Sequence, residues 1–302
     1  MPCYDDGTPQ LCFSMKLLIV NADDFGYTRG VNAGIVRGFR EGIVTSTTIM
    51  SNGEAFEDAI ERARTNPKLG VGCHLVLVGG KCVAATKNVS SLVDSEGQLP
   101  ASLTILLSKL SVGSVRTEEI ETELRAQVER VMAAGLRPTH FDSHKHTHAH
   151  PRVMEVVVRV AEEFKVGRIR KPFEDRRELL WPAMSAGAGS WKQRFAALMA
   201  GVGESRFRSL ANSHGMRAPE HFMGVAATGR LNREAILSMI GAMRDGATEL
   251  MCHPGEYDEE LQQAATRLKQ ERETELGGLT DPDVRNAIRE RDIHLINFGE
   301  LN

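Results

Sequence analysis

Two adjacent aspartates, Asp23 and Asp24, directly follow an apolar run in the segment VNADDFGYTRG at 20–30. The run KLLIV at 16–20 is typical of a buried strand, and two like charges side by side are an unfavourable way to end one. A bound cation beside the pair would offset their repulsion and keep both carboxylates ionised. At a strand end the backbone can turn, so that one carboxylate ligates the cation while the other stays free to accept a proton.

A second group of ionisable residues lies in the segment PTHFDSHKHTHAH at 138–150. Five of the ten histidines of the chain fall within it. Residues two apart share one face of an extended strand, and this alternation holds for His140, Asp142, His144, His146, His148 and His150. If the strand turns into a loop near His146, only the first few of these side chains stay aligned.

We expect Asp24, His74 and His144 to hold one divalent metal ion. Two imidazoles and one carboxylate suit Zn²⁺, Mn²⁺, Co²⁺ or Fe²⁺ better than Mg²⁺, which prefers oxygen ligands. Three protein ligands leave a position open for water, as catalytic sites do, and a bound metal lowers the pKa of that water from about 15.7 to about 7. Asp23 is then the expected base that takes a proton from the attacking water.

The elements that must position these residues alternate between short β-branched runs and amphipathic helices, which predicts parallel strands with helices outside. We expect strands at 16–22, 43–50, 69–77, 138–144, 167–172, 222–227, 248–253 and 293–298. We expect helices at 28–41, 54–65, 101–110, 190–201, 231–243, 258–276 and 282–290, with others from Thr117 and Pro151. Seven or eight such units predict a single-domain α/β fold, either a β/α barrel or a distorted or incomplete one.

In such folds, ligands bind at the carboxyl ends of the strands. This rule brings the candidate residues from separate parts of the chain to one rim, namely Asp23, Asp24, His74, Asp142, His144, Arg170 and His253. Arg170 is expected to hold substrate or to orient a proton donor. Asp142, His146 and His148 are expected to lie behind the metal ligands and orient them. The irregular segment 78–116 is long enough to cover a substrate.

Length and composition bound the class of protein. The 302 residues suit one domain at 15–302, and 1–14 are expected to be a loose extension before Met15. With 37 basic and 40 acidic residues, the bulk charge gives no indication of a nucleic-acid partner. The sequence predicts no membrane span and no secretory signal. Its five scattered cysteines favour reduced thiols in a cytoplasmic protein, whereas peripheral membrane contact and a homodimer stay open.

Each signal has a simpler interpretation when it stands alone. Paired aspartates usually form a solvated turn or a helix cap, His74 could be a core histidine, and HKHTHAH could be an exposed loop with adventitious metal affinity. His253 could merely cap a strand, and the charged run at 256–276 is most simply a solvated helix face. Trp181 and Trp191 could belong to the core or to a wall for a sugar face. The joint placement at strand ends is what favours the metal site.

Two other classes of protein use similar residues. A non-haem iron oxygenase also binds its metal with two histidines and a carboxylate, but it would not need the second aspartate or the distant His253. In a non-catalytic module for metal binding or storage, changing Asp23 to asparagine would leave the function intact. Acetate release without oxygen would exclude the first class, and loss of turnover on changing Asp23 would exclude the second.

The motifs NADDFG at 21–26 and DSHKHTH at 142–148, together with GIVTSTTIMSNG, GVGCHLVL and ELMCHPGE, resemble the YdjC-like carbohydrate deacetylases over nearly the whole chain. The resemblance implies hydrolysis of an N-acetyl group from an amino sugar on a barrel-like scaffold. It places the metal on Asp24, His74 and His144, and it makes Asp23 the base and His253 the acid. The family is described with magnesium, whereas the ligand chemistry favours zinc, so the metal stays open between Mg²⁺ and Zn²⁺.

Four further segments are similar to the branch of that family associated with hopanoid biosynthesis. They are HLVLVGGKCV, LVDSEGQLP, GRIRKPFE and VAATGRLNRE. This resemblance implies a lipid-linked N-acetylglucosamine as the substrate. A chito-oligosaccharide is the alternative substrate within the same family.

Overall fold

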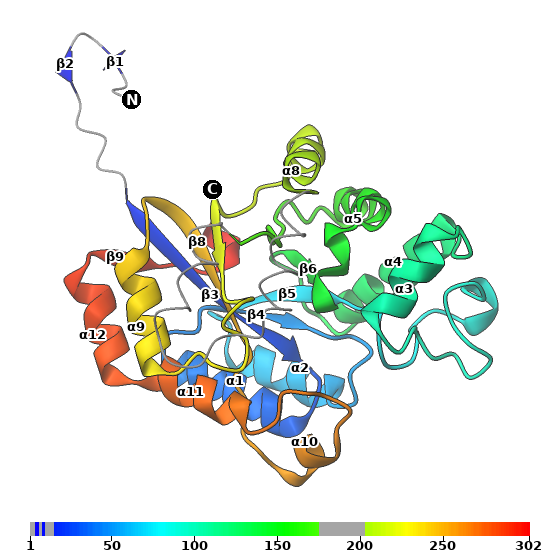
Figure 1. Ribbon diagram of the computed structural model, residues 1–302, viewed down its shortest axis with the longest axis horizontal. Coiled ribbons are helices and arrows are strands. Elements are labelled where there is room, and N and C mark those ends of the chain that lie inside the picture. The colour runs from blue at the N-terminus through cyan, green and yellow to red at the C-terminus, as the bar shows by residue number, and fades with distance from the viewer. Residues whose placement is uncertain (1–3, 6–7, 10–14, 175–202) are drawn as a thin grey trace.

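The computed structural model describes residues 4–5, 8–9, 15–174 and 203–302 of the chain. Its centre is a sheet of seven parallel strands in the order β6-β5-β4-β3-β8-β7, with β9 beside the start of β3 (Figure 1). The strands are β3 (Lys16–Phe25), β4 (Ser46–Ile49), β5 (Gly70–Leu75), β6 (Phe141–Ser143), β7 (His221–Met223), β8 (Gly246–Cys252) and β9 (Ile293–Leu295). Two further short strands, β1 (Tyr4–Asp5) and β2 (Thr8–Pro9), pair antiparallel with each other.

The sheet continues beyond β6 through isolated parallel bridges rather than a full strand. These bridges join Phe141 to Ile169 and Arg168 to Arg217. The predicted strand at 167–172 is therefore present only as single pairings. The sheet is a curled half-barrel, which confirms the predicted distorted or incomplete barrel.

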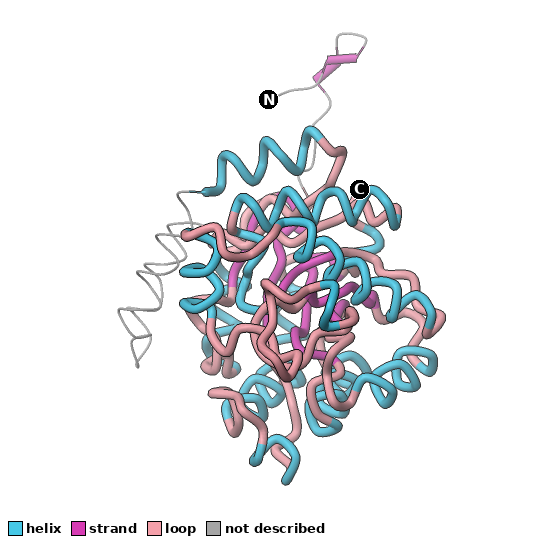
Figure 2. The backbone as a smooth tube through the Cα atoms, turned by 90° about the vertical axis from the view of Figure 1, so that its right-hand side faces the viewer, coloured by secondary structure: helices cyan, strands magenta, loops and turns pink. Residues whose placement is uncertain are grey.

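Helices surround the strands, as the view in Figure 2 shows with strands inside and helices outside. The α-helices are α1 (Arg29–Glu41), α2 (Phe56–Thr65), α3 (Leu103–Ser111), α4 (Thr117–Ala133), α5 (Pro151–Phe164), α8 (Glu204–Ser213), α9 (Arg233–Ala242), α10 (Glu259–Gln263), α11 (Glu271–Thr280) and α12 (Pro282–Glu290). Short 3₁₀ helices lie at Thr86–Asn88, His144–Ala149 and Phe298–Glu300. Within the described residues, no helix combines the length and the apolar character that a bilayer crossing requires.

The ends of several helices follow from local chemistry. The hydroxyl of Thr28 accepts a hydrogen bond from the backbone N–H of Val31 at 3.2 Å and so caps α1. Pro151 occupies the first turn of α5, where its missing N–H costs no hydrogen bond. The predicted helix starts at these two places are confirmed to within one residue.

Strand β3 is buried on both faces, as expected of a central parallel strand covered by helices. All its residues from Leu18 to Phe25 are buried, including both aspartates. Its parallel neighbours β4 and β8, and β5 beyond β4, run in the same direction. Their carboxyl ends therefore share one edge of the sheet, to which they carry the candidate residues.

One predicted helix differs from expectation, and another cannot be compared with the structure. The single charged helix predicted at 258–276 is two helices, α10 and α11, separated by irregular residues 264–270. The break lets α11 turn part of its polar surface inward, as described below for the site. The helix expected near 190–201, together with Trp181 and Trp191, lies outside the described residues.

Helix α1 packs closely against the segment that follows β8. The backbone N–H of Glu256 donates to the carbonyl of Gly30 at 2.9 Å. A Cβ atom placed on Gly34 would lie only 2.4 Å from the Cα of Gly255. Glycine at this position of α1 is therefore what allows the helix to approach the chain beside His253.

We predict that Gly34→Ala destabilises the fold, because the new methyl group forces α1 away from Gly255. The expected loss is about 1–3 kcal/mol of the free energy of unfolding, as for other overpacked sites. The matched control is Gly277→Ala in α11, where no atom lies within 4 Å of the added Cβ. That change should stabilise the helix by roughly 0.5–1 kcal/mol. Urea denaturation of both variants measures the difference, and an equal response of the two would contradict the packing argument.

Candidate active site

The two aspartates lie at an irregularity in β3. Ala22 pairs with Thr47 of β4 and Phe25 pairs with Ile49, so three steps along β3 correspond to two along β4. This is the register of a β-bulge, which adds a residue to one strand and re-aims its side chains. Asp24 also has a φ of 71°, in the left-handed region that non-glycine residues seldom adopt. The bulge thereby turns consecutive carboxylates toward different partners.

The structure brings the three predicted metal ligands together. Asp24 Oδ1 lies 3.5 Å from His74 Nε2 and 3.3 Å from His144 Nδ1, and the two ring nitrogens are 3.3 Å apart. In the described structure, the buried Oδ1 atom has no hydrogen-bond partner. Four-coordinate Zn²⁺ with bonds of 2.0–2.1 Å implies donors about 3.4 Å apart. The donor set therefore fits a small divalent cation.

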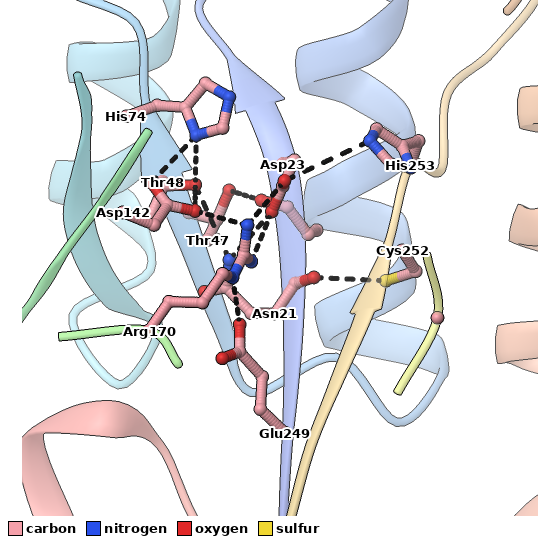
Figure 3. A network of polar contacts seen from close by, with 12 residues as sticks. Asn21, Asp23, Thr47, Thr48, His74, Asp142, Arg170, Glu249, Cys252 and His253 are labelled. Carbon is pink, nitrogen blue, oxygen red and sulfur yellow. Dashed lines mark hydrogen bonds and ion pairs between the residues drawn. The ribbon is translucent and has the colours of Figure 1, made fainter. Parts of the chain in front are cut away.

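His74 is held from behind by the carboxylate of Asp142. Its Nδ1 lies 2.8 Å from Asp142 Oδ1, and the hydroxyl of Thr48 donates to Asp142 Oδ2 at 3.0 Å (Figure 3). Burial lowers the pKa of His74, but the Asp142 carboxylate outweighs burial and raises it to about 9. The raised pKa means that both ring nitrogens carry a proton near pH 7, so a metal ion held at Nε2 would displace that proton while Asp142 keeps the one on Nδ1. Asp142 thus lies where an orienting residue was predicted.

Arg170 lies at the centre of a buried network of carboxylates (Figure 3). It donates to both oxygens of Asp23, at 2.7 and 2.6 Å, and to Glu249 at 2.7 Å. It also pairs with Asp142 at 2.7 Å, and its side chain is 0% exposed. The expectation that Arg170 holds substrate is corrected, because this guanidinium is enclosed by carboxylates and has no open face. Its contacts instead fix the orientation of Asp23.

A second set of possible donors, Asp23, His74 and Asp142, also lies within 4.8 Å. Arg170 already supplies the positive charge between these two carboxylates. His74 directs a different nitrogen, Nδ1, toward Asp142. The cluster of Asp24, His74 and His144 is therefore the better candidate for a metal.

Glu249 is a carboxyl group that the sequence analysis did not select. Burial raises its pKa to about 8, although Arg170 opposes the shift. The signal that could have identified it is a charged residue within the otherwise apolar strand TELMC. A protonated Glu249 leaves the charge of Arg170 to be balanced mainly by Asp23 and Asp142.

Two residues of α11 also support the site, although the run 256–276 was expected to be a solvated helix face. Arg272 is only 1% exposed and donates to Asp24 Oδ2 at 2.5 Å. Glu275 accepts hydrogen bonds from the backbone N–H groups of His253 and Gly229, both at 2.5 Å. Burial raises the pKa of Asp24, but Arg272, His144 and His253 together outweigh burial and hold it well below its usual range. The solvated-face expectation is therefore wrong for these two residues.

His253 lies on the other side of Asp23 from His74 (Figure 3). Its Nε2 is 4.0 Å from Asp23 Oδ2, and its Nδ1 has no partner among the described residues. Burial lowers the pKa of His253 to about 4, although Asp23 opposes the shift. The ring is therefore neutral near pH 7 before any substrate chemistry begins.

The two later histidines of the cluster take different positions. The ring of His148 lies 2.5 Å from the hydroxyl of Ser143 and 3.2 Å from the carbonyl oxygen of Arg170. Burial lowers its pKa to about 4. The ring of His146 packs edge-on against Phe222. His148 thus supports the backbone of Arg170, and neither imidazole contacts the predicted metal ligands through a hydrogen bond.

A cleft of about 1000 Å³ opens beside His144. One wall comes from the irregular segment expected to cover the substrate, through residues that include Val93, Leu99, Pro100 and Ile105. Residues after β3 and at the end of α10 also line the cleft. Enzyme pockets for small molecules have volumes of roughly 300–1,000 Å³, so this cleft has room for more than its catalytic end.

The fold and the site define a class, namely α/β half-barrel proteins with a candidate metal centre at the carboxyl edge of the sheet. Within this class the chain belongs to the YdjC-like protein family, whose sequence model matches residues 17–290. The match spans every candidate residue named above.

Individual relatives agree with this assignment. A carbohydrate deacetylase of Brevibacillus brevis is 39% identical over 286 residues, which cover 94% of this chain and 99% of the relative. A carbohydrate deacetylase of Geobacillus stearothermophilus is 36% identical over 287 residues, covering 95% and 98%. The crystal structure of a putative cellobiose-phosphate cleavage protein from Enterococcus faecalis V583 matches with a TM-score of 0.79 at 28% identity, covering 95% of this chain and 99% of that one.

We predict that Glu249→Gln changes how stability depends on pH. The folded pKa of about 8 is above the ordinary value of 4.5. The stabilising contribution of Glu249 is therefore complete below pH 4.5 and is lost as pH rises through about 8. Glutamine does not titrate, so the free energy of unfolding of the wild type should fall relative to the variant across this range.

Urea denaturation at several pH values measures this difference. Glu290→Gln, which changes an exposed carboxyl group on α12, is the matched control and should give a constant offset. A constant difference between the wild type and Glu249→Gln would mean that Glu249 has the same pKa in the folded and unfolded states.

Proposed function

We propose that this protein is a metal-dependent hydrolase that removes the N-acetyl group from an N-acetylglucosamine-containing substrate. The observation that carries the proposal is the unpartnered, buried Asp24 Oδ1 facing the ring nitrogens of His74 and His144. Membership of the YdjC-like family and the similarity to two carbohydrate deacetylases support it.

Asp24, His74 and His144 would hold the metal, each through one atom. The bound ion would polarise the acetyl carbonyl group and increase the acidity of water. The two imidazole donors favour Zn²⁺ over Mg²⁺, and Mg²⁺ remains the alternative. In either case Asp142 keeps the lone pair of His74 directed at the ion, because it binds the opposite nitrogen of the ring.

Asp23 acts as the base that removes a proton from the attacking water. Both its oxygens bind Arg170, which fixes their position and compensates the negative charge of the carboxylate. Arg170 is itself held by Glu249 and Asp142. The base is thus oriented in advance, so no side-chain entropy has to be lost to order it during the reaction.

His253 delivers a proton to the leaving amine, since an amide nitrogen leaves poorly until it is protonated. The imidazole is neutral at first, because burial lowers its pKa. Asp23 lies 4.0 Å from His253 Nε2 and carries the proton taken from water. Passing that proton from Asp23 to His253 and then to the amine balances the hydrolysis and restores both residues.

The substrate that we propose is a lipid-linked N-acetylglucosamine, with a chito-oligosaccharide as the alternative. Most of the residues at 92–105 that line the cleft are apolar, although Asp94 and Gln98 are among them. Such a wall suits an apolar group attached to the sugar.

The proposed location is the cytoplasm. The structure describes three free thiols, those of Cys73, Cys82 and Cys252, which supports this location. The protein would then contact a membrane-borne substrate from the membrane surface only.

We predict that Asp23→Asn lowers turnover by about 10²–10⁴-fold, the usual contribution of a general base. Metal affinity should be retained, because Asp23 is bound to Arg170 rather than directed at the metal ligands. Acetate release and calorimetric metal titration measure the two properties. Asp292→Asn is the matched control, since the side chain of Asp292 is 96% exposed. Unchanged turnover would contradict the role as base, and lost metal binding would make Asp23 a ligand.

We predict that acetate release is faster with an N-acetylglucosaminyl hopanoid than with chitobiose, because the cleft has an apolar wall. The comparison uses enzyme stripped of metal and enzyme reconstituted with Zn²⁺ or Mg²⁺. The stripped enzyme should be inactive on both substrates. A preference for chitobiose would contradict the lipid-linked substrate, and no acetate from either would contradict the proposed substrate class.

A further inference from the structure

Helix α11 buries an arginine whose ionic partner is a predicted metal ligand. Arg272 is 1% exposed and donates through one terminal nitrogen to Asp24 Oδ2 at 2.5 Å. Its Nε donates to the carbonyl oxygen of Leu268 at 3.3 Å, and the guanidinium carbon lies 5.9 Å from the centre of the Tyr27 ring. Among the described residues, Asp24 is the carboxylate with which Arg272 forms an ion pair.

The chain makes specific room for this side chain. A Cβ atom on Gly255 would lie 3.0 Å from Cδ of Arg272, so a larger residue there would crowd the arginine. The N–H of Gly255 also donates to the backbone carbonyl of Arg272 at 3.2 Å. The segment beside His253 and helix α11 therefore fix the arginine from two directions.

We propose that Arg272 is a positioning residue that fixes how Asp24 binds the metal, an inference that rests on the proposed metal site. The guanidinium occupies Oδ2, so Asp24 presents only Oδ1 to His74 and His144. Asp24 has a left-handed backbone at a strand bulge, where neighbouring strand residues do not hold its side chain in a regular pleat. The ion pair with Arg272 supplies that restraint.

Burial strengthens this assignment. A buried guanidinium without a charged partner is costly, and removing one member of a buried pair leaves the other uncompensated. One terminal nitrogen of Arg272 already lacks a hydrogen-bond partner in the described structure. The contact with Asp24 is therefore the interaction that justifies burying this charge.

The test is metal binding by Arg272→Lys and Arg272→Met, measured by calorimetric titration of the metal-free proteins with Zn²⁺ and with Mn²⁺. Lysine keeps the charge but loses the planar fork, and methionine loses both. We expect each variant to bind about 10–100-fold more weakly, the usual effect of losing a group that orients a metal ligand. The matched control is Arg233→Met, which removes an exposed arginine paired with Asp283 and should leave affinity unchanged.

Thermal unfolding of the metal-free proteins separates positioning from folding. Arg272→Lys should melt close to the wild type while still losing metal affinity, so the lysine variant keeps the test valid if Arg272→Met fails to fold. Affinity equal to or tighter than that of the wild type in a folded Arg272→Lys would overturn the positioning role. Failure of the wild type to bind either metal would instead overturn the proposed metal site.

Discussion

The site depends on keeping two consecutive carboxylates ionised inside the protein. Each is compensated by a different buried arginine, Arg170 for Asp23 and Arg272 for Asp24. The bulge in β3 makes this possible, because it directs neighbouring side chains to different partners. Without the two arginines, two adjacent negative charges would be buried with no cation to compensate them.

This separation gives the two aspartates different chemistry. One oxygen of Asp24 remains unpartnered and faces two imidazoles, as a ligand must. Both oxygens of Asp23 are held by Arg170, and the carboxylate lies 4.0 Å from His253. The surroundings of the two aspartates, rather than their residue type, therefore make Asp24 suited to bind a metal and Asp23 suited to act as a base. Helix α11 restrains both Asp24 and the backbone of His253.

The sequence predicts the three metal ligands better than it predicts the buried residues of α11 that support the site. Asp24, His74 and His144 each stand at or near the carboxyl end of an apolar run, so the topology of a parallel sheet predicts that they meet. Arg272 and Glu275 lie in a strongly charged run whose pattern is that of a solvated helix, and only their tertiary partners show that they are buried. The strand expected at 167–172 forms single bridges, because propensity does not determine where a curled sheet stops pairing.

The most direct measurement is a crystal structure of the protein grown with Zn²⁺ or Mn²⁺, with anomalous diffraction data collected at the absorption edge of the metal. The account predicts one strong anomalous peak bonded to Asp24 Oδ1, His74 Nε2 and His144 Nδ1, with Arg272 still bound to Asp24 Oδ2. A peak among Asp23, His74 and Asp142, the second cluster within 4.8 Å, or no peak near β3 would contradict it.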